Sequence, residues 1–506
     1  MNTYPRMKQF ITMLVCFVTL FSIEVHGLTN PKREFRGAWI QCVNGQFQGL
    51  SREAMQQKLL TQLDALQRIN TNVIMFQVRA EGDALYPSTL EPWSRYLSGT
   101  QGLPPNPYWD PLQWMVEQCH NRGMEIHAWI NPYRAKTKGT TEFSVRHPYS
   151  LHPERFFKYG DLLIFNPALQ ENRDWICRVV HDILNRYDVD GIHMDDYFYP
   201  YPQAGTPIPD EAEYQKSGSG FANVADWRRD NVNKLIKELH DTVRAVKPWV
   251  KFGVSPFGIY HNYKEGDSIP GSRTRGSENY NMLYADVLKW VNEGWVDYNV
   301  PQLYWNIGFK IADYAELVHF WAKYAGNRPI VVGQDLTRSM NGRGIKDTTQ
   351  SQLPEKWDLQ RSTPGVVGSC LWYSAVVADN LGGCTDYLAQ TYHKYPALQP
   401  KMPFIDKKDP KKVKGLKVMR MPDGPNLIWI PRTEKNLMDQ ATRYVVYRFA
   451  QGEKENLEDA SHIWKITNQT CVKLPNKDGN AKFIYCVTAL DRVQNESKAK
   501  KVKVKL

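Results

Sequence analysis

The sequence predicts an α/β protein in which a (β/α)8 barrel, the TIM barrel, is followed by a small all-β sandwich. Three observations predict this fold. Eight strand-like apolar runs alternate with helical segments, the long connections follow strands and not helices, and residues 411–506 carry only strand patterns. A chain of 506 residues, 42% of them hydrophobic, is long enough to bury the cores of two domains.

Residues 1–27 predict a secretory signal peptide. A basic start precedes an uncharged apolar stretch from Phe10 to Ile23, and Gly27 supplies a small residue at the cleavage site. This stretch is too short to span a bilayer comfortably, and no other segment is apolar enough to do so. Lipoprotein anchoring at Cys16 is disfavoured because the preceding Val15 is not small. We therefore expect export to the periplasm or the cell exterior, without a stable transmembrane segment.

The barrel is expected over residues 28–395. Its strand-like runs are separated by helical periodicities, such as the apolar stripe of Met55, Leu59, Leu63 and Leu66. The expected strands cover residues 35–41, 72–79, 124–130, 191–195, 251–256, 296–304, 329–333 and 365–373.

The helix after the second strand has clear limits. Asp110 is suited to the N-cap, Pro111 to the first helical position, and Gly123 to the end. Connections from helix to strand are short, whereas those from strand to helix are long after strands two to five. The long connections cover residues 80–109, 131–170, 196–225 and 257–280. In a barrel they all lie on the C-terminal face, where active sites are built.

Prolines and lysines predict a linker over residues 396–410, followed by the sandwich over residues 411–506. This last segment holds 20 Lys and Arg against 10 Asp and Glu, which is nearly all of the net charge of +11. A basic module suits an anionic cell-envelope polymer or a membrane surface. The alternating lysines and valines of residues 501–505 are equally typical of a solvated strand face, which is the favoured interpretation. No nucleic-acid partner is expected.

The stretch "VDGIHMDDYFYPYP", residues 189–202, places two adjacent aspartates at the end of the fourth expected strand. A buried acid pair is costly unless it has partners or a function. Glycoside hydrolysis requires two carboxyl groups. Asp195 is the candidate nucleophile or charge stabiliser. Asp196 is the candidate general acid, because like-charge repulsion raises the pKa of one member of such a pair. Glu81 and Asp83 are the alternatives for the acid.

Polar and aromatic side chains at the other strand ends are expected to hold a sugar chain. Aromatic faces stack on pyranose rings, and amides and arginines hold hydroxyl groups. Ser255 ends the fifth strand in the same region. No cofactor is expected. The predicted substrate-binding residues are Arg79, Asp83, His127, Trp129, Asn131, Arg134, His193, Tyr197, Gln302, Tyr304, Trp305 and Trp372.

Several stretches carry a family resemblance, among them "FRGAWI", "YWDPLQWMVEQCHNRGMEIHAWINPYR", "YDVDGIHMDDYFYPYP" and "PGVVGSCLWYS". With them the chain resembles the glycosyl-hydrolase-like 10 family of bacterial exported proteins. The resemblance implies a (β/α)8 barrel that hydrolyses glycans, with bacterial cell-wall (peptidoglycan) strands as the substrate class. The C-terminal part resembles a fibronectin type III-like module. The α-amylase signature, which the fourth strand also resembles, has its nucleophile at Asp195. The acid of the chitinase signature falls on Tyr197, so substrate-assisted chemistry is not expected.

Two other functions remain open at this point. A metal-dependent hydrolase would use His127, His193, Asp195 and Asp196 as ligands, although their spacing matches no metal motif. A glycan-binding protein without catalysis would keep the same face but lack a working acid. An odd number of mature cysteines and the absence of a CxxC motif predict neither a zinc site nor a disulfide framework, and leave open a pairing of Cys471 with Cys486.

Overall fold

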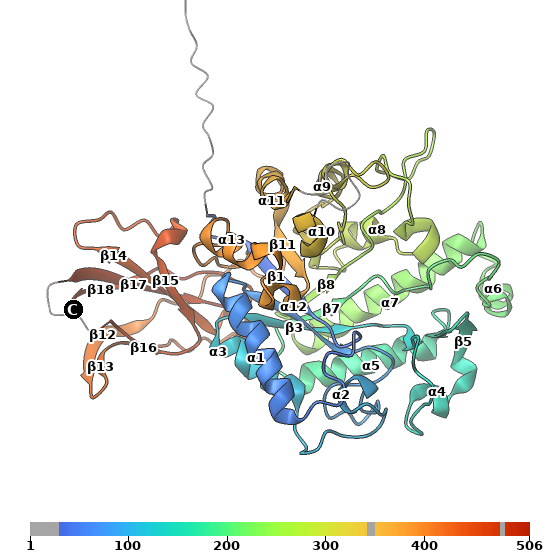
Figure 1. Ribbon diagram of the computed structural model, residues 1–506, viewed down its shortest axis with the longest axis horizontal. Coiled ribbons are helices and arrows are strands. Elements are labelled where there is room, and N and C mark those ends of the chain that lie inside the picture. Colours follow the sequence, from blue (N-terminus) through green and yellow to red (C-terminus); the bar gives the residue numbers. More distant parts are fainter. Residues whose placement is uncertain (1–29, 342–349, 476–480) are drawn as a thin grey trace, which may run out of the picture.

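The computed structural model describes residues 30–341, 350–475 and 481–506 (Figure 1). The predicted signal peptide and Cys16 lie outside these ranges. Within them, no helix has both the length and the apolar character needed to cross a membrane.

Eight parallel strands close into a barrel, which confirms the predicted fold class. Their order around the barrel is β1-β11-β10-β9-β8-β7-β3-β2. The strands are β1 (Phe35–Ile40), β2 (Val73–Arg79), β3 (Glu125–Ile130), β7 (Gly191–Met194), β8 (Lys251–Val254), β9 (Tyr298–Asn299), β10 (Ile330–Asp335) and β11 (Val366–Trp372).

Each predicted strand run overlaps one of these strands; β10 extends two residues past its predicted run, and the sixth strand is much shorter than predicted. β9 ends at Asn299, because Pro301 has no N–H to donate to the ladder. Single bridges resume at Gln302, which pairs with Phe257 on one side and Gly333 on the other. The barrel therefore closes here through a minimal strand.

Helices surround the barrel on its outside (Figure 1). The predicted stripe of α1 is buried at Met55, Leu59, Leu63 and Leu66. The main helices are α1 (Arg52–Arg68), α3 (Pro111–Asn121), α5 (Gln170–Arg186), α7 (Val224–Val246), α8 (Val287–Asn292), α9 (Tyr314–Lys323), α11 (Leu353–Ser362) and α13 (Cys384–Gln390).

Helix α3 begins as predicted, since Asp110 Oδ1 accepts a hydrogen bond of 3.1 Å from the Gln113 amide and Pro111 follows. After the helix, Gly123 has φ +75°. A Cβ at this position would lie 2.9 Å from the carbonyl oxygen of Ile466 in the C-terminal module. Glycine therefore permits both the turn and the close approach of the two domains.

The connections on the C-terminal face carry additional structure. A three-stranded antiparallel sheet, absent from the sequence prediction, follows β3. The short elements of this face are α2 (Arg95–Ser98), β4 (Arg134–Lys136), α4 (Pro148–Leu151), β5 (Phe156–Tyr159), β6 (Leu162–Phe165), α6 (Glu211–Ser217), α10 (Leu336–Asn341) and α12 (Ser374–Ala378).

The C-terminal module consists of two antiparallel sheets, as predicted for an all-β domain. One sheet contains β12 (Lys414–Met421), β13 (Gly424–Ile430) and β16 (Cys471–Lys473); the other contains β15 (Ile463–Thr467), β14 (Arg443–Ala450), β17 (Lys482–Leu490) and β18 (Lys500–Lys505). Leu427 and Trp429 of the first sheet share a core with Val446 and Tyr485 of the second. The assignment to the fibronectin type III class stays a prediction. Cys471 and Cys486 are both free.

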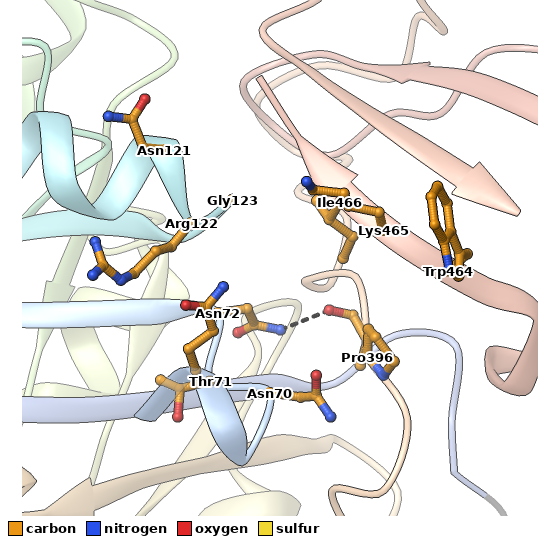
Figure 2. A pocket seen from close by; sticks show the side chains of 12 residues that line it. Asn70, Thr71, Asn72, Asn121, Arg122, Gly123, Pro396, Trp464, Lys465 and Ile466 are labelled. Atoms are coloured by element: carbon orange, nitrogen blue, oxygen red, sulfur yellow. Dashed lines mark hydrogen bonds between the residues drawn. The ribbon is translucent and has the colours of Figure 1, made fainter. Parts of the chain in front are cut away.

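The predicted linker follows the base of the barrel closely. Leu398 exchanges backbone hydrogen bonds of 2.8 Å with Lys32 and Glu34. Figure 2 shows the Asn72 side chain donating to the Ala397 carbonyl, at 3.0 Å, beside a hollow of about 240 Å³ between barrel and module. The segment around residue 398 thus fixes the module to the barrel.

Charged side chains from the module enter the base of the barrel. Arg443 of β14 donates to the Met124 carbonyl (3.2 Å) and to Asp190 (3.1 Å). Gln494 donates to Glu125 at 2.8 Å, and Lys251 donates to the same carboxylate at 2.6 Å. All of these side chains are buried. Buried charges require such partners, since losing water costs each of them several kcal/mol. Burial alone would raise the pKa of Asp190. Arg443 and His120 nevertheless hold this pKa well below its usual range.

The first prediction concerns this buried network. Arg443→Met removes the arginine that pairs with Asp190, while Glu125 keeps Lys251, so we expect the free energy of unfolding to fall by about 3 kcal/mol. Urea unfolding followed by tryptophan fluorescence measures the change. The matched control is Arg448→Met, on the same strand, where the half-buried arginine forms no ion pair in the described part of the chain. Equal losses in the two variants would contradict the assigned role of Arg443.

Candidate active site

The two predicted catalytic aspartates directly follow β7, at the C-terminal face of the barrel. Asp195 is 4% exposed and Asp196 is 2% exposed. Because β7 ends at Met194, neither residue is held to strict strand alternation. Two adjacent carboxyl groups are thus buried at the position where barrel enzymes place their chemistry.

Few hydrogen-bond donors reach the Asp195 carboxyl group. Trp129 Nε1 donates to its Oδ2 at 3.2 Å, and the backbone amide of Tyr197 lies 3.4 Å from its Oδ1. Burial, followed by the charge of Asp196, raises the pKa of Asp195 to about 8. Asp195 therefore holds a proton at neutral pH.

Asp196 is better supplied with donors. The Tyr201 hydroxyl donates a short hydrogen bond to its Oδ2. Burial raises the pKa of Asp196, whereas the hydrogen bond from Tyr201, the charge of Arg134 and a hydrogen bond from Gln302 oppose that rise. The sequence prediction omits Tyr201, whose only signal is its place in the aromatic cluster after the aspartates.

Arg134, a predicted binding residue, is brought to the pair by the small sheet after β3. Its half-buried guanidinium lies over the ring of Tyr197, 3.1 Å from the ring centre. The positive charge of Arg134 lowers the pKa of both aspartates. Among the described residues, Arg134 is thus a cation that acts on both acids.

Aromatic rings surround the acids. Trp129, which donates to Asp195, has its ring centre 6.4 Å from that of Trp372 at the end of β11. Tyr304 stacks on Trp372 at 6.2 Å with an interplanar angle of 27°. Trp305 meets Phe257 edge to face at 5.6 Å. Tyr304, Trp305 and Trp372 are all partly exposed, so their faces are available to a ligand.

Two buried polar atoms beside the acid pair have no partner among the described residues. They are Nδ2 of Asn131 and Oγ of Ser255. Asn131 follows β3 and Ser255 follows β8, the two strands that flank β7 in the barrel. Unpaired buried polar atoms cost free energy, which a ligand that supplies partners would recover.

His127 and His193, both predicted to bind substrate, lie inside the barrel in one hydrogen-bonded chain. The Trp39 indole can only donate, so its bond to His193 Nε2 (3.1 Å) places the His193 proton on Nδ1. That proton points to the Tyr298 hydroxyl (3.2 Å), which donates to His127 Nδ1 (2.6 Å). The remaining His127 proton, on Nε2, reaches Glu125 at 3.2 Å.

This chain uses every ring nitrogen of His127 and His193. Both side chains are fully buried, and burial lowers the pKa of each, so both are neutral. Across the described residues there is no group of three or more His, Cys, Asp or Glu side chains placed to hold a metal ion. The four metal ligands considered from the sequence are therefore not assembled as a site.

Arg79 and the two alternative acids support loops in this structure. Arg79 is fully buried and forms two hydrogen bonds with Glu91, at 2.7 and 2.8 Å. Glu81 accepts hydrogen bonds from Arg95 at 3.0 Å, and from two threonines. Asp83 accepts from the Glu81 amide at 3.0 Å, and burial together with the Glu81 charge raises the pKa of Asp83 to about 6. In the described part of the chain, these residues have no hydrogen bond with either of the predicted catalytic aspartates.

Known proteins give the site a family context. The model of the family "Glycosyl hydrolase-like 10" matches residues 34–347, more than half of the chain. "Glycosyl hydrolase YngK" of Bacillus subtilis (strain 168) is 37% identical over 504 residues, covering 97% of this chain and 98% of the relative. "Glycosyl hydrolase DigH" of Escherichia coli (strain K12) is 40% identical over 277 residues, 53% of this chain and 62% of the relative.

Among solved structures, the PgaB (BpsB) glycoside hydrolase domain from Bordetella bronchiseptica is similar with a TM-score of 0.45 and 11% identity. The similarity covers 71% of this chain and 99% of that domain, and is too distant to bear on activity. The family match and the full-length relative are decisive: the chain belongs to the glycosyl hydrolase-like 10 family.

Proposed function

We propose that this protein is a glycoside hydrolase with Asp195 and Asp196 as its catalytic carboxyl groups. The observation that carries the proposal is the unequal support of two adjacent buried acids at the C-terminal face. Asp195 has a pKa raised to about 8, while Asp196 has several donors. Environments that separate the pKa values of two carboxyl groups are typical of acid–base pairs in glycosidases. Membership of a family named for glycosyl hydrolases supports the same conclusion.

The hydrogen bonding favours Asp195 as the general acid. It transfers its proton to the glycosidic oxygen while the bond from that oxygen to the anomeric carbon breaks. A water molecule then bonds to the anomeric carbon and gives its proton to the Asp195 carboxylate, which restores the acid. Asp196, which accepts hydrogen bonds from Tyr201 and Gln302 and lies near the charge of Arg134, offsets the positive charge that develops on the sugar. This assignment exchanges the roles predicted from the sequence, which shows the pair but not the donors around each member.

The substrate proposed is a glycan strand of the bacterial cell wall, the class implied by the family resemblance. Partly exposed rings of Tyr304, Trp305 and Trp372 provide stacking surfaces for pyranose rings. The unpaired atoms of Asn131 and Ser255 provide hydrogen-bonding groups for sugar hydroxyls. Because such strands lie outside the cytoplasm, the proposal includes export through the signal predicted at residues 1–27.

Leaving-group dependence tests the two roles. Asp195→Asn removes the acid, so we expect hydrolysis of an unactivated glycan to fall by about 10²–10⁴-fold. Hydrolysis of an aryl glycoside with a good leaving group should slow far less, because the departing aryl group needs little protonation. Asp196→Asn should slow both substrates, since both develop charge on the sugar.

The control for these variants is Asp161→Asn, an exposed aspartate between β5 and β6, which should leave both rates unchanged. Near-normal turnover by Asp195→Asn would place the chemistry elsewhere. Glycan binding by the unaltered protein without any product would identify a non-catalytic binding protein.

The pH dependence of kcat/KM tests the proton on Asp195. A general acid must be protonated, and the pKa of Asp195 is about 8. Above this pH, kcat/KM should therefore fall about tenfold for each further pH unit. Arg134→Gln removes a charge that lowers the pKa of Asp195, and should move this limb to higher pH. Arg273→Gln, an exposed arginine in the loop after β8, should leave the limb in place. A rate that instead rises through pH 8 would restore the nucleophile role to Asp195.

A further inference from the structure

The C-terminal module has a hollow of about 440 Å³ where the chain enters β12. Its volume falls within the range of small-molecule binding sites, about 300–1,000 Å³. Three separate segments form it: the residues before and at the start of β12, one residue after β13, and one before β18. The lining residues are Asp409, Pro410, Lys411, Lys412, Val413, Lys414, Arg432 and Lys498.

Four cations of this hollow are not neutralised by neighbouring acids. Lys412, Lys414, Arg432 and Lys498 form no ion pair and no side-chain hydrogen bond within residues 30–341, 350–475 and 481–506. Lys411 differs from them, because Glu434 lies 2.7 Å from its ammonium group. These four side chains therefore leave a concentrated positive charge around one hollow.

The lining of the hollow suits an anion. Pro410 and Val413 are buried beneath it, while Lys412, Lys414 and Lys498 are exposed around it. Four like charges around one hollow repel one another. Asp409, an acid that also lines the hollow, lies 3.8 Å from Lys401. An arginine can bind a phosphate or carboxylate with two parallel hydrogen bonds, and lysines add point charges.

The lysines of β18, which dominate the basic pattern in the sequence, are arranged differently. Lys503 and Lys505 point to solvent while Val504 is buried, and Lys501 pairs with Glu455 at 3.0 Å. This strand is the solvated face that the alternation predicts. The positive charge around the hollow is carried instead by the segment that enters β12 and by the other residues that line the hollow.

We propose that this hollow binds a linear polyanion, a polymer that bears phosphate or carboxylate groups along its length. The cations come from three segments and surround a volume much larger than one phosphate group, which favours several anionic groups over a single ion. The residues that line the hollow include no Trp, Phe or Leu of the kind that enters a membrane surface. The binding is separate from catalysis, and the proposal does not depend on the glycosidase assignment.

Binding of full-length protein to labelled inorganic polyphosphate and to polygalacturonate, measured by fluorescence anisotropy over a range of salt concentrations, tests the proposal. Lys412→Glu with Arg432→Glu should weaken binding at least about tenfold and reduce the salt dependence. The matched control, Lys454→Glu with Lys465→Glu, makes the same change in net charge at exposed lysines of the module outside the hollow, and should weaken binding less than about threefold.

Binding to either polymer with this pattern supports the proposal and identifies the anionic group. Equal weakening by the two variant pairs, or no binding to either polymer, would overturn it. Binding only to phosphatidylglycerol vesicles would overturn it in favour of a membrane contact. Circular dichroism checks the fold of each variant, and the milder pair Lys412→Gln with Arg432→Gln repeats the test. Hydrolysis of a short uncharged glycan should be the same in all these variants, so the result is independent of the catalytic proposal.

Discussion

The rest of the molecule depends on the hydrogen bonds and ion pair of the Glu125 carboxylate, which is buried at the base of β3. It accepts hydrogen bonds from Lys251 of β8, from Gln494 of the module and from His127 above it in the barrel. Burial would raise the pKa of Glu125, yet the Lys251 ammonium and the His127 bond hold it below its usual range. Removing a partner of a buried charge is strongly destabilising. One side chain thus joins barrel wall, barrel interior and C-terminal module.

The two ends of the barrel treat buried acids in opposite ways. At the base, Glu125 and Asp190 are fully supplied with cations and donors, which stabilises the fold. At the C-terminal face, Asp195 and Asp196 share Arg134, and neighbouring polar atoms of Asn131 and Ser255 lack partners in the described chain. That contrast is expected if stability is secured at one end and reactivity is reserved for the other.

The sequence predicts the barrel well because strand runs, caps and loop lengths are local signals. All eight runs overlap a strand, and the aspartate pair falls at a strand end as expected. Contacts between distant segments are what the sequence does not contain. Strand alternation predicts that His193 lies on the same side as Asp195. It does not predict how deep in the barrel His193 lies, or that Trp39 and Tyr298 form hydrogen bonds with both of its ring nitrogens. The pairing of Arg79 with Glu91 and the donors of Asp196 are likewise products of loop folding. The three-stranded sheet after β3 has strands of three and four residues, too short for a clear pattern.

The central claim is that a glycosidic bond is broken at the Asp195–Asp196 pair. A crystal structure of the Asp195→Asn variant with an intact glycan oligosaccharide bound tests it most directly, because the substitution preserves shape while blocking proton transfer. We expect one glycosidic oxygen within hydrogen-bonding distance of residue 195, the adjoining anomeric carbon facing Asp196, and sugar rings stacked on Trp372 or Tyr304. An oligosaccharide bound with no glycosidic oxygen near either aspartate would contradict the account.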